Sequence, residues 1–151
     1  MTTKTNEIFI DAPAQAIYRL AATTERWPEY LPHYRRVRVV SGDDRRRVVE
    51  MAAWRDVIPI RWVAEQINDP DIPHIAFRHI AGWTKGMEVE WIFTPQGNGT
   101  RVQIVHRLQF RFPFASEWLG EYVVGDFFIH YVASKTLARM KRLVEGEGGG
   151  A

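Results

Sequence analysis

Residues 101–110 read Arg-Val-Gln-Ile-Val-His-Arg-Leu-Gln-Phe, and apolar and polar side chains alternate along most of this stretch. A period of two is typical of a half-buried β-strand, because successive side chains point to opposite faces. His106 shares a face with Ile104 and Leu108 and is therefore predicted to point inward. A buried imidazole needs a hydrogen-bond partner, or a hollow that holds water or ligand. The stretch thus predicts either a core histidine or one that faces a ligand pocket.

The composition fits a small domain with a large core. The chain has 151 residues, of which 46% are hydrophobic and 13% aromatic. This length is most simply one domain. We expect that domain over residues 1–145, with a flexible glycine-rich tail at 146–151. Many large aromatic side chains are found both in dense cores and in aromatic-lined pockets, and composition does not separate the two.

Charge and residue types exclude several classes of function. The formal net charge of +2 is too small to indicate nucleic-acid binding. The chain has no cysteine, which excludes disulfides, thiolate nucleophiles and cysteine-based zinc sites. The five histidines lack paired metal-ligand spacing, so we predict no metal site and no cofactor. The N-terminus lacks a signal-peptide pattern and no stretch is apolar enough to span a membrane, so we expect a cytoplasmic protein.

The predicted elements follow each other as one strand, two short helices, further strands and one long helix. Pro13 suits the start of a helix, and Gly42 and Gly97 begin tight turns between strands. Antiparallel neighbours joined by such turns form a curved sheet, and the long helix must cover its concave face. We therefore predict an α+β fold: a curved antiparallel sheet of about seven strands around a long C-terminal helix, with two short helices after the first strand. The expected strands are 7–10, 34–40, 47–54, 58–67, 75–80, 87–93 and 102–110, and the expected long helix is 118–145.

Five short motifs carry a resemblance to a known family. They are NEIFIDAP at 6–13, WPEY at 27–30, WIFTP at 91–95, GNGTRV at 97–102 and MKRL at 140–143. Together with the order of elements, they make the chain similar to the START-like helix-grip superfamily. Within it, the chain most resembles the polyketide cyclase/dehydrase and coenzyme-Q-binding branch. The resemblance covers nearly the whole chain and implies the helix-grip fold, but the branch includes aromatase/cyclases as well as lipid and quinone binders.

The polyketide aromatase/cyclases give the most detailed comparison. Trp62 matches a tryptophan of those enzymes, but Gln66 stands where they carry an arginine, and this departure speaks against an enzyme. His106 matches a histidine or glutamine that faces their cavity. The resemblance also aligns Arg78 with a further arginine, and His130 with a polar residue of the long helix. It thus implies His106, Arg78 and His130 as catalytic candidates.

Simpler explanations stand beside these roles. Arg78 shares a strand face with Ala76 and Ile80, where it faces inward toward an anion or carbonyl, or pairs with Glu50 or Glu65. A hydrogen-bonded contact between helix and sheet explains the histidine of the long helix. The predicted ligand-binding set combines large apolar side chains with hydroxyl and amide groups, and core packing explains its aromatic members equally well. That set is Tyr30, Tyr34, Trp54, Trp62, Gln66, Trp83, Met87, Trp91, Phe110, Phe127, Tyr131 and Ser134.

Two functions use these residues and a third needs no ligand. The first is binding of a hydrophobic, partly oxygenated small molecule such as a polyketide, quinone or lipid, held by burial of apolar surface. The second is a polyketide aromatase/cyclase: His106 removes an α-proton, Arg78 or a tyrosine polarises the accepting carbonyl, and His130 assists loss of water. An acyl-carrier protein is the expected partner in that case. The third is a protein-interaction module with a filled core, and the sequence leaves monomer and oligomer open.

Overall fold

The structure, a computed structural model, describes residues 2–55, 57–82, 84–108 and 131–147. Residues 131–133 are helical and lead into α4. None of the helices in these ranges is long and apolar enough to cross a membrane. The strands are β1 (Thr2–Ile10), β2 (Tyr34–Gly42), β3 (Arg46–Arg55), β4 (Ile58–Asp69), β5 (His74–Gly82), β6 (Glu88–Gln96) and β7 (Gly99–Leu108). The helical segments are α1 (Ala14–Ala22), η1 (Thr24–Arg26), α2 (Trp27–Tyr30), α4 (Ser134–Lys141) and the π-helical η3 (Arg142–Glu147).

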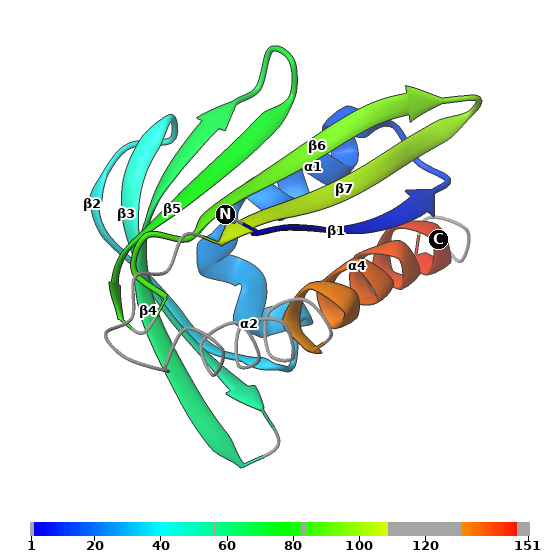
Figure 1. Ribbon diagram of the computed structural model, residues 1–151. Helices are drawn as coiled ribbons and strands as arrows, with labels where there is room; N and C mark the ends of the chain where they lie inside the picture. The colour runs from blue at the N-terminus through cyan, green and yellow to red at the C-terminus, as the bar shows by residue number, and fades with distance from the viewer. Residues whose placement is uncertain (1, 56, 83, 109–130, 148–151) are drawn as a thin grey trace.

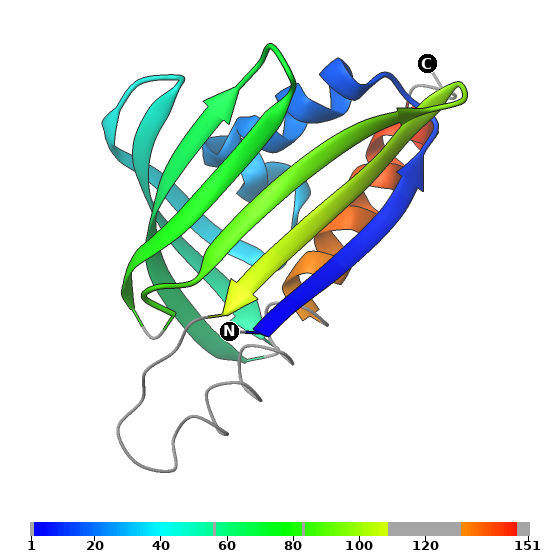
Figure 2. The same cartoon turned by 45° about the horizontal axis from the view of Figure 1, so that its top comes forward.

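The strands form one antiparallel sheet in the order β1-β7-β6-β5-β4-β3-β2. β1 pairs with β7 from Thr2 opposite Leu108 to Ile10 opposite Thr100, so the first and last strands are neighbours. Figures 1 and 2 show a strongly curved sheet, with α4 across its concave side and α1 and α2 on that same side. The predicted α+β helix-grip fold is confirmed.

Strand pairing extends several strands beyond their hydrophobic pattern. β1 begins at Thr2 rather than at residue 7, because the polar residues between them still pair with β7. β4 runs to Asp69 and β5 begins at His74, so both continue past their predicted ends. The C-terminal helix extends to Glu147, two residues into the predicted tail. Residues 118–130 of the expected helix and 148–151 of the expected tail lie outside the described residues.

The concave face of the sheet and the inner faces of the helices form the hydrophobic core. α1 contributes Ile17 and Ala21, and α4 contributes Leu137 and Met140. Ile17 and Met140 are completely buried. Full burial of a large apolar side chain contributes about 1.5–3 kcal/mol. The core therefore holds both helices against the same sheet.

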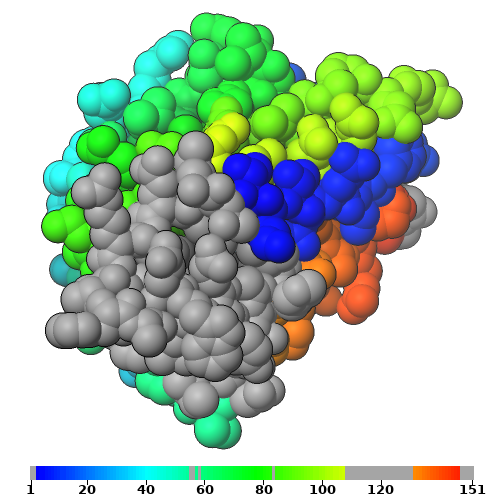
Figure 3. Space-filling model, in the orientation of Figure 1, coloured from blue at the N-terminus to red at the C-terminus, as the bar shows by residue number. Residues whose placement is uncertain are grey.

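Polar contacts fasten the end of the C-terminal helix to β1. The Lys141 ammonium group donates to the Phe9 carbonyl oxygen at 2.6 Å and pairs with Glu145 at 2.7 Å. The Glu145 carboxylate in turn accepts a hydrogen bond from the Asp11 backbone N–H at 2.9 Å. Figure 3 shows β1 and this helix side by side at the surface. These contacts fix one end of the helix at the sheet edge.

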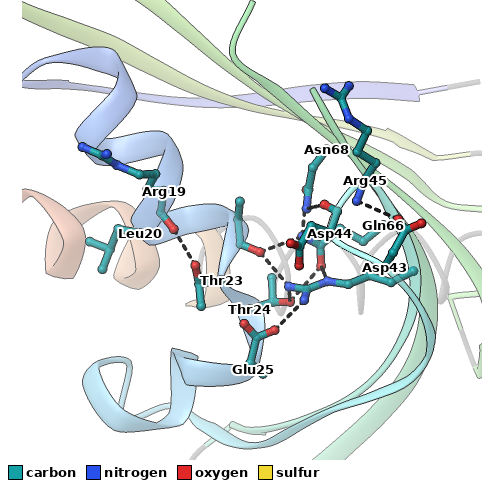
Figure 4. Close-up of polar contacts among 12 residues, drawn as sticks. Arg19, Leu20, Thr23, Thr24, Glu25, Asp43, Asp44, Arg45, Gln66 and Asn68 are labelled. Atoms are coloured by element: carbon teal, nitrogen blue, oxygen red, sulfur yellow. Dashed lines mark hydrogen bonds and ion pairs between the residues drawn. The ribbon is translucent and has the colours of Figure 1, made fainter. Parts of the chain in front are cut away.

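A polar cluster, buried except for Glu25, joins the segment after α1 to β3 and β4 (Figure 4). The Arg47 guanidinium donates to the Ala22 carbonyl oxygen at 2.7 Å and to Thr24 Oγ1 at 2.9 Å. It also pairs with the Glu25 carboxylate at 2.6 Å. Its charge is thus neutralised and its donors are used inside the protein. We call this group the Arg47 cluster; its members are Thr24, Glu25, Arg47, Gln66 and Asn68.

Gln66 lies at the centre of the Arg47 cluster and is completely buried. It faces Arg47 directly in the pairing of β3 with β4. Its Oε1 accepts a hydrogen bond from Thr24 Oγ1 at 2.8 Å. Its Nε2 donates to the Ala22 carbonyl oxygen at 2.9 Å and to Asn68 Oδ1 at 2.8 Å. The hydrogen bonds of the Gln66 amide therefore hold α1 and η1 against the sheet.

We expect Gln66→Ala to lower the free energy of unfolding by about 2–4 kcal/mol, because it leaves buried partners without hydrogen bonds. Urea denaturation measures this loss. Gln103→Ala is the matched control: Gln103 bonds Glu7 at the protein surface, and its loss should cost about 0.5 kcal/mol or less. Equal effects of the two substitutions would show that the Arg47 cluster does not stabilise the fold.

Candidate functional site

Two hollows lie between the sheet and the C-terminal helix. The inner pocket is buried and has a volume of about 40 Å³. That is space for about one water molecule, much less than the cavity expected for a polyketide or quinone. From the sheet it is lined by Tyr34, Trp62, Phe77, His79, Trp91 and His106, and from the helix by Val132, Ala133 and Thr136.

The second hollow, the outer groove, is open at the surface and has a volume of about 770 Å³. Sites for drug-sized ligands have volumes of about 300–1,000 Å³. Three parts of the described structure border the groove: the segment between α2 and β2, the β3–β4 hairpin and the C-terminal helix. They contribute Pro32 and His33, then Trp54 and Val57, and finally Tyr131, Lys135, Ala138, Arg139 and Arg142.

One hydrogen bond lies between the two hollows. His33, which borders the outer groove, shares a hydrogen bond of 2.9 Å between its Nε2 and Oγ1 of Thr136, which lines the inner pocket. Consecutive residues of the helix face different hollows at this level, since Tyr131 borders the groove and Val132 lines the pocket. The two hollows are therefore neighbours on either side of the His33–Thr136 contact.

Two imidazoles from the described part of the chain line the inner pocket. His106 is only 3% exposed, as the alternation along β7 predicts. His79 is also buried, stacks on Trp62 with ring centres 5.8 Å apart, and hydrogen-bonds Thr84 through Nδ1 at 2.6 Å. His79 was not among the predicted site residues, although Ile75, Phe77 and His79 alternate as the residues around His106 do. Applying the same test to β5 would have found it.

Burial keeps these histidines neutral. It lowers the pKa of His106 to about 4. Burial, with a smaller contribution from His106, lowers the pKa of His79 to about 3. Burial and the charge of Lys135 lower the pKa of His33 to about 4. At neutral pH each ring therefore has one donor and one acceptor nitrogen and is a weak base.

A further polar group of the inner pocket is the indole N–H of Trp27. Trp27 lines the pocket and is 2% exposed. Within the part of the chain that the structure describes, its buried Nε1 has no hydrogen-bond partner. A buried donor without an acceptor costs about 1–3 kcal/mol. An oxygen atom of a bound molecule would remove that cost.

The prediction that Arg78 faces inward is wrong. Arg78 is exposed on the convex face of β5, between Glu65 of β4 and Glu88 of β6. The inward face of β5 carries Ile75, Phe77 and His79 instead. The sequence misled here because Ala76 and Ile80 give the opposite face an apolar pattern too. Arg78 therefore lines neither hollow.

Other predicted residues divide between the two hollows. Tyr34, Trp62 and Trp91 line the inner pocket, and Trp54 and Tyr131 border the outer groove. Four line neither: Gln66 belongs to the Arg47 cluster, Tyr30 donates to the Leu20 carbonyl oxygen at 2.6 Å, Met87 is in the core and Ser134 is exposed. Trp83, Phe110, Phe127 and His130 lie outside the described residues.

The described residues contain no group of three histidine, aspartate or glutamate side chains arranged to hold a metal ion. The polar groups of the two hollows are instead neutral imidazoles, hydroxyls, an indole N–H and basic side chains. Such groups bind and orient oxygen atoms of a small molecule.

Solved structures of other proteins have the same fold as this chain. The protein TTHA0849 of Thermus thermophilus matches with a TM-score of 0.81 and 24% identity, over 97% of this chain and 99% of that one. The Zhui aromatase/cyclase of Streptomyces sp. R1128 matches with a TM-score of 0.80 and 17% identity, over 97% and 98%. A START superfamily protein of Mycobacterium smegmatis matches with a TM-score of 0.67 and 13% identity, over 96% and 95%. At these identities the likeness shows a shared fold.

Sequence comparison adds a family. The granaticin polyketide synthase bifunctional cyclase/dehydratase of Streptomyces violaceoruber is 29% identical over 105 residues, which are 68% of this chain. This chain spans about a third of that protein, because the match covers 32% of its length. The model of the family described as polyketide cyclase / dehydrase and lipid transport matches residues 10–140. Since that match covers most of the chain, the protein belongs to the polyketide cyclase/dehydrase and lipid transport family and has its START-like helix-grip fold.

Proposed function

We propose that this protein binds a hydrophobic, partly oxygenated small molecule, of the polyketide, quinone or lipid class, between the sheet and the C-terminal helix. Family membership supports a role in hydrophobic-ligand binding or cyclisation. The observation that carries the proposal is the outer groove of about 770 Å³, which adjoins an aromatic-walled pocket with two neutral imidazoles. The body of the ligand occupies the groove, and its inner end reaches the pocket.

The inner end needs more room than the pocket has. One wall of the pocket consists of the small side chains of Val132, Ala133 and Thr136 on the helix. A small outward shift of the helix, with loss of the His33–Thr136 hydrogen bond, would join pocket and groove. A net cost of about 0.5–1.5 kcal/mol for one such bond is small beside the burial of an aromatic ring.

Polar groups in the pocket favour a ligand with oxygen atoms. The Trp27 indole donates without accepting, and a neutral His106 both donates and accepts. Ketone, quinone and hydroxyl oxygens accept hydrogen bonds from such donors without carrying a charge into the core. A pure hydrocarbon would leave the indole N–H without a partner.

A second candidate function is a polyketide cyclase, which the 29% identical cyclase/dehydratase favours. His106 would take an α-proton, and the resulting carbanion would attack a ketone carbon of the same chain. The C–C bond forms, and the new alkoxide takes the proton back from His106. With Arg78 on the convex face, polarisation of that ketone would fall to Tyr34. The lowered pKa of His106 makes it a weak base, so positioning would have to supply most of the rate.

The binding proposal is tested by native mass spectrometry of the purified protein and by extraction of what it carries. We expect an apolar molecule with ketone, quinone or hydroxyl oxygens, and we expect His106→Leu to retain about fivefold less, the equivalent of one lost hydrogen bond. His74→Leu is the control, because His74 pairs with Glu90 away from both hollows. A wild-type protein that carries nothing and binds no such compound would favour the interaction-module hypothesis.

The cyclase alternative is tested with a poly-β-ketone attached to a carrier protein. If His106 is the base, His106→Leu should slow cyclisation by about 100-fold or more and change the distribution of ring products. An acyl-carrier protein is the proposed partner in this reaction. An unchanged rate and ring pattern, together with reduced ligand retention, would exclude catalysis by His106.

The neutral histidines also predict a pH dependence of stability. Their folded-state pKa values lie below the unfolded value of about 6.5, so the folded state binds fewer protons. The contribution of these neutral histidines to the free energy of unfolding is therefore fully present above about pH 6.5 and is lost as the pH falls toward about 4. Each buried ring contributes a slope of at most about 1.4 kcal/mol per pH unit. Urea unfolding across this range should show the loss, and His106→Leu should reduce its slope; an unchanged slope would mean that His106 titrates normally.

A further inference from the structure

The outer groove has two unlike sides. Pro32, Trp54 and Val57 give an apolar side, and Val57 is 85% exposed although it is a large hydrophobic residue. The helix side carries three basic residues, Lys135, Arg139 and Arg142. Their spacing of four and then three residues places them on one helix face. The groove thus pairs an exposed apolar surface with a row of cations.

These cations are not neutralised by the described part of the protein. Arg139 donates through Nε to the Tyr30 carbonyl oxygen at 3.0 Å, and Lys135 lies 4.2 Å from the centre of the Tyr131 ring. Among the described residues, no carboxylate forms an ion pair with any member of this row.

Many other described basic residues do have acidic partners. Glu50 alone pairs with three arginines of the convex face, and Lys141 pairs with Glu145 on the next part of the helix. Favourable interaction with the negative end of the helix explains cations in its last turn but not Lys135, which lies at the start of α4. The row in the groove is therefore a local concentration of positive charge that has no carboxylate partner among the described residues.

The charge of Lys135, the first member of this row, acts on another residue that borders the groove. His33 borders the groove, and the charge of Lys135 is the second cause, after burial, of its lowered pKa. The same positive charge would attract a negative group placed in the groove. The groove volume suits a small molecule rather than the convex surface of an acidic protein.

We propose that the ligand of the outer groove carries an oxyanion, a carboxylate or a phosphate, held by Lys135 and Arg142 with help from Arg139. Its apolar body lies against Trp54 and Val57. This inference rests on the proposed function and adds to it the class of ligand: an anionic amphiphile bound with its acidic end at the helix and its apolar end toward the pocket.

The test compares three probes that share one aromatic body: 2-naphthoate, 2-naphthyl phosphate and the uncharged methyl ketone 2-acetonaphthone. Calorimetric titration at about 20 mM salt should show at least about tenfold tighter binding of an anionic probe than of the ketone. The difference should shrink at about 300 mM salt, because exposed charges are screened. The stronger of the two anions identifies whether a carboxylate or a phosphate is the preferred group.

The variant Lys135→Gln/Arg142→Gln should lose this advantage while binding the ketone as the wild type does. The control is Arg46→Gln/Lys85→Gln, which makes the same change in net charge at exposed positions that border neither hollow. Arg46 lies eight residues from Trp54 along β3, or about 27 Å. If both double variants weaken anion binding equally, or if neither weakens it, the inference is overturned. Binding of the ketone would still support the proposed function in that case. Failure of all three probes to bind the wild type would overturn both.

Discussion

The apolar concave face of the curved sheet must be covered, and the C-terminal helix covers it. Pairing of β1 with β7 completes the sheet, and contacts of Lys141 and Glu145 with the end of β1 fix the helix at its edge. Leu137 and Met140 then fill the space against the sheet. Further toward the start of the described helix, the small side chains of residues 132, 133 and 136 leave the sheet and helix less tightly packed. The inner pocket lies at this level, and the outer groove extends along the helix from Tyr131 to Arg142.

Alternation predicted the fold and part of the site. His106 could be placed because only one face of β7 has a nearly continuous apolar pattern. Arg78 could not, because β5 is apolar on both faces and its register depends on pairing with its neighbours. Gln66 was predicted to bind ligand, but it is buried among partners from α1, η1 and β3. Such long-range polar contacts leave no periodic signal in the sequence. The basic row of the groove leaves none either, because its role depends on the residues on the other side of the groove.

The Arg47 cluster gives a physical reason why this chain departs from the aromatase/cyclases. Those enzymes are expected to carry an arginine where Gln66 stands, whereas here the neighbouring strand supplies the guanidinium of Arg47. That guanidinium is buried and bound to Glu25, Thr24 and a backbone carbonyl. A second arginine at position 66 would bring two buried positive charges together at a large cost in free energy. Gln66 and Arg47 are therefore parts of one hydrogen-bonded arrangement that stabilises the fold.

The distribution of charge also fixes how a ligand would lie. Among the described residues, the polar groups that line the inner pocket are neutral, and moving an ionised group into such a place costs far more than one hydrogen bond returns. The outer groove offers cations and remains in contact with water. An amphiphile with an acidic end can satisfy both regions in one direction only, with its anion at Lys135 and Arg142 and its apolar, ketone-bearing end toward His106. Such fixed polarity would present the same end of every ligand to the imidazoles, which is a requirement for selective binding and for positional control of a cyclisation alike.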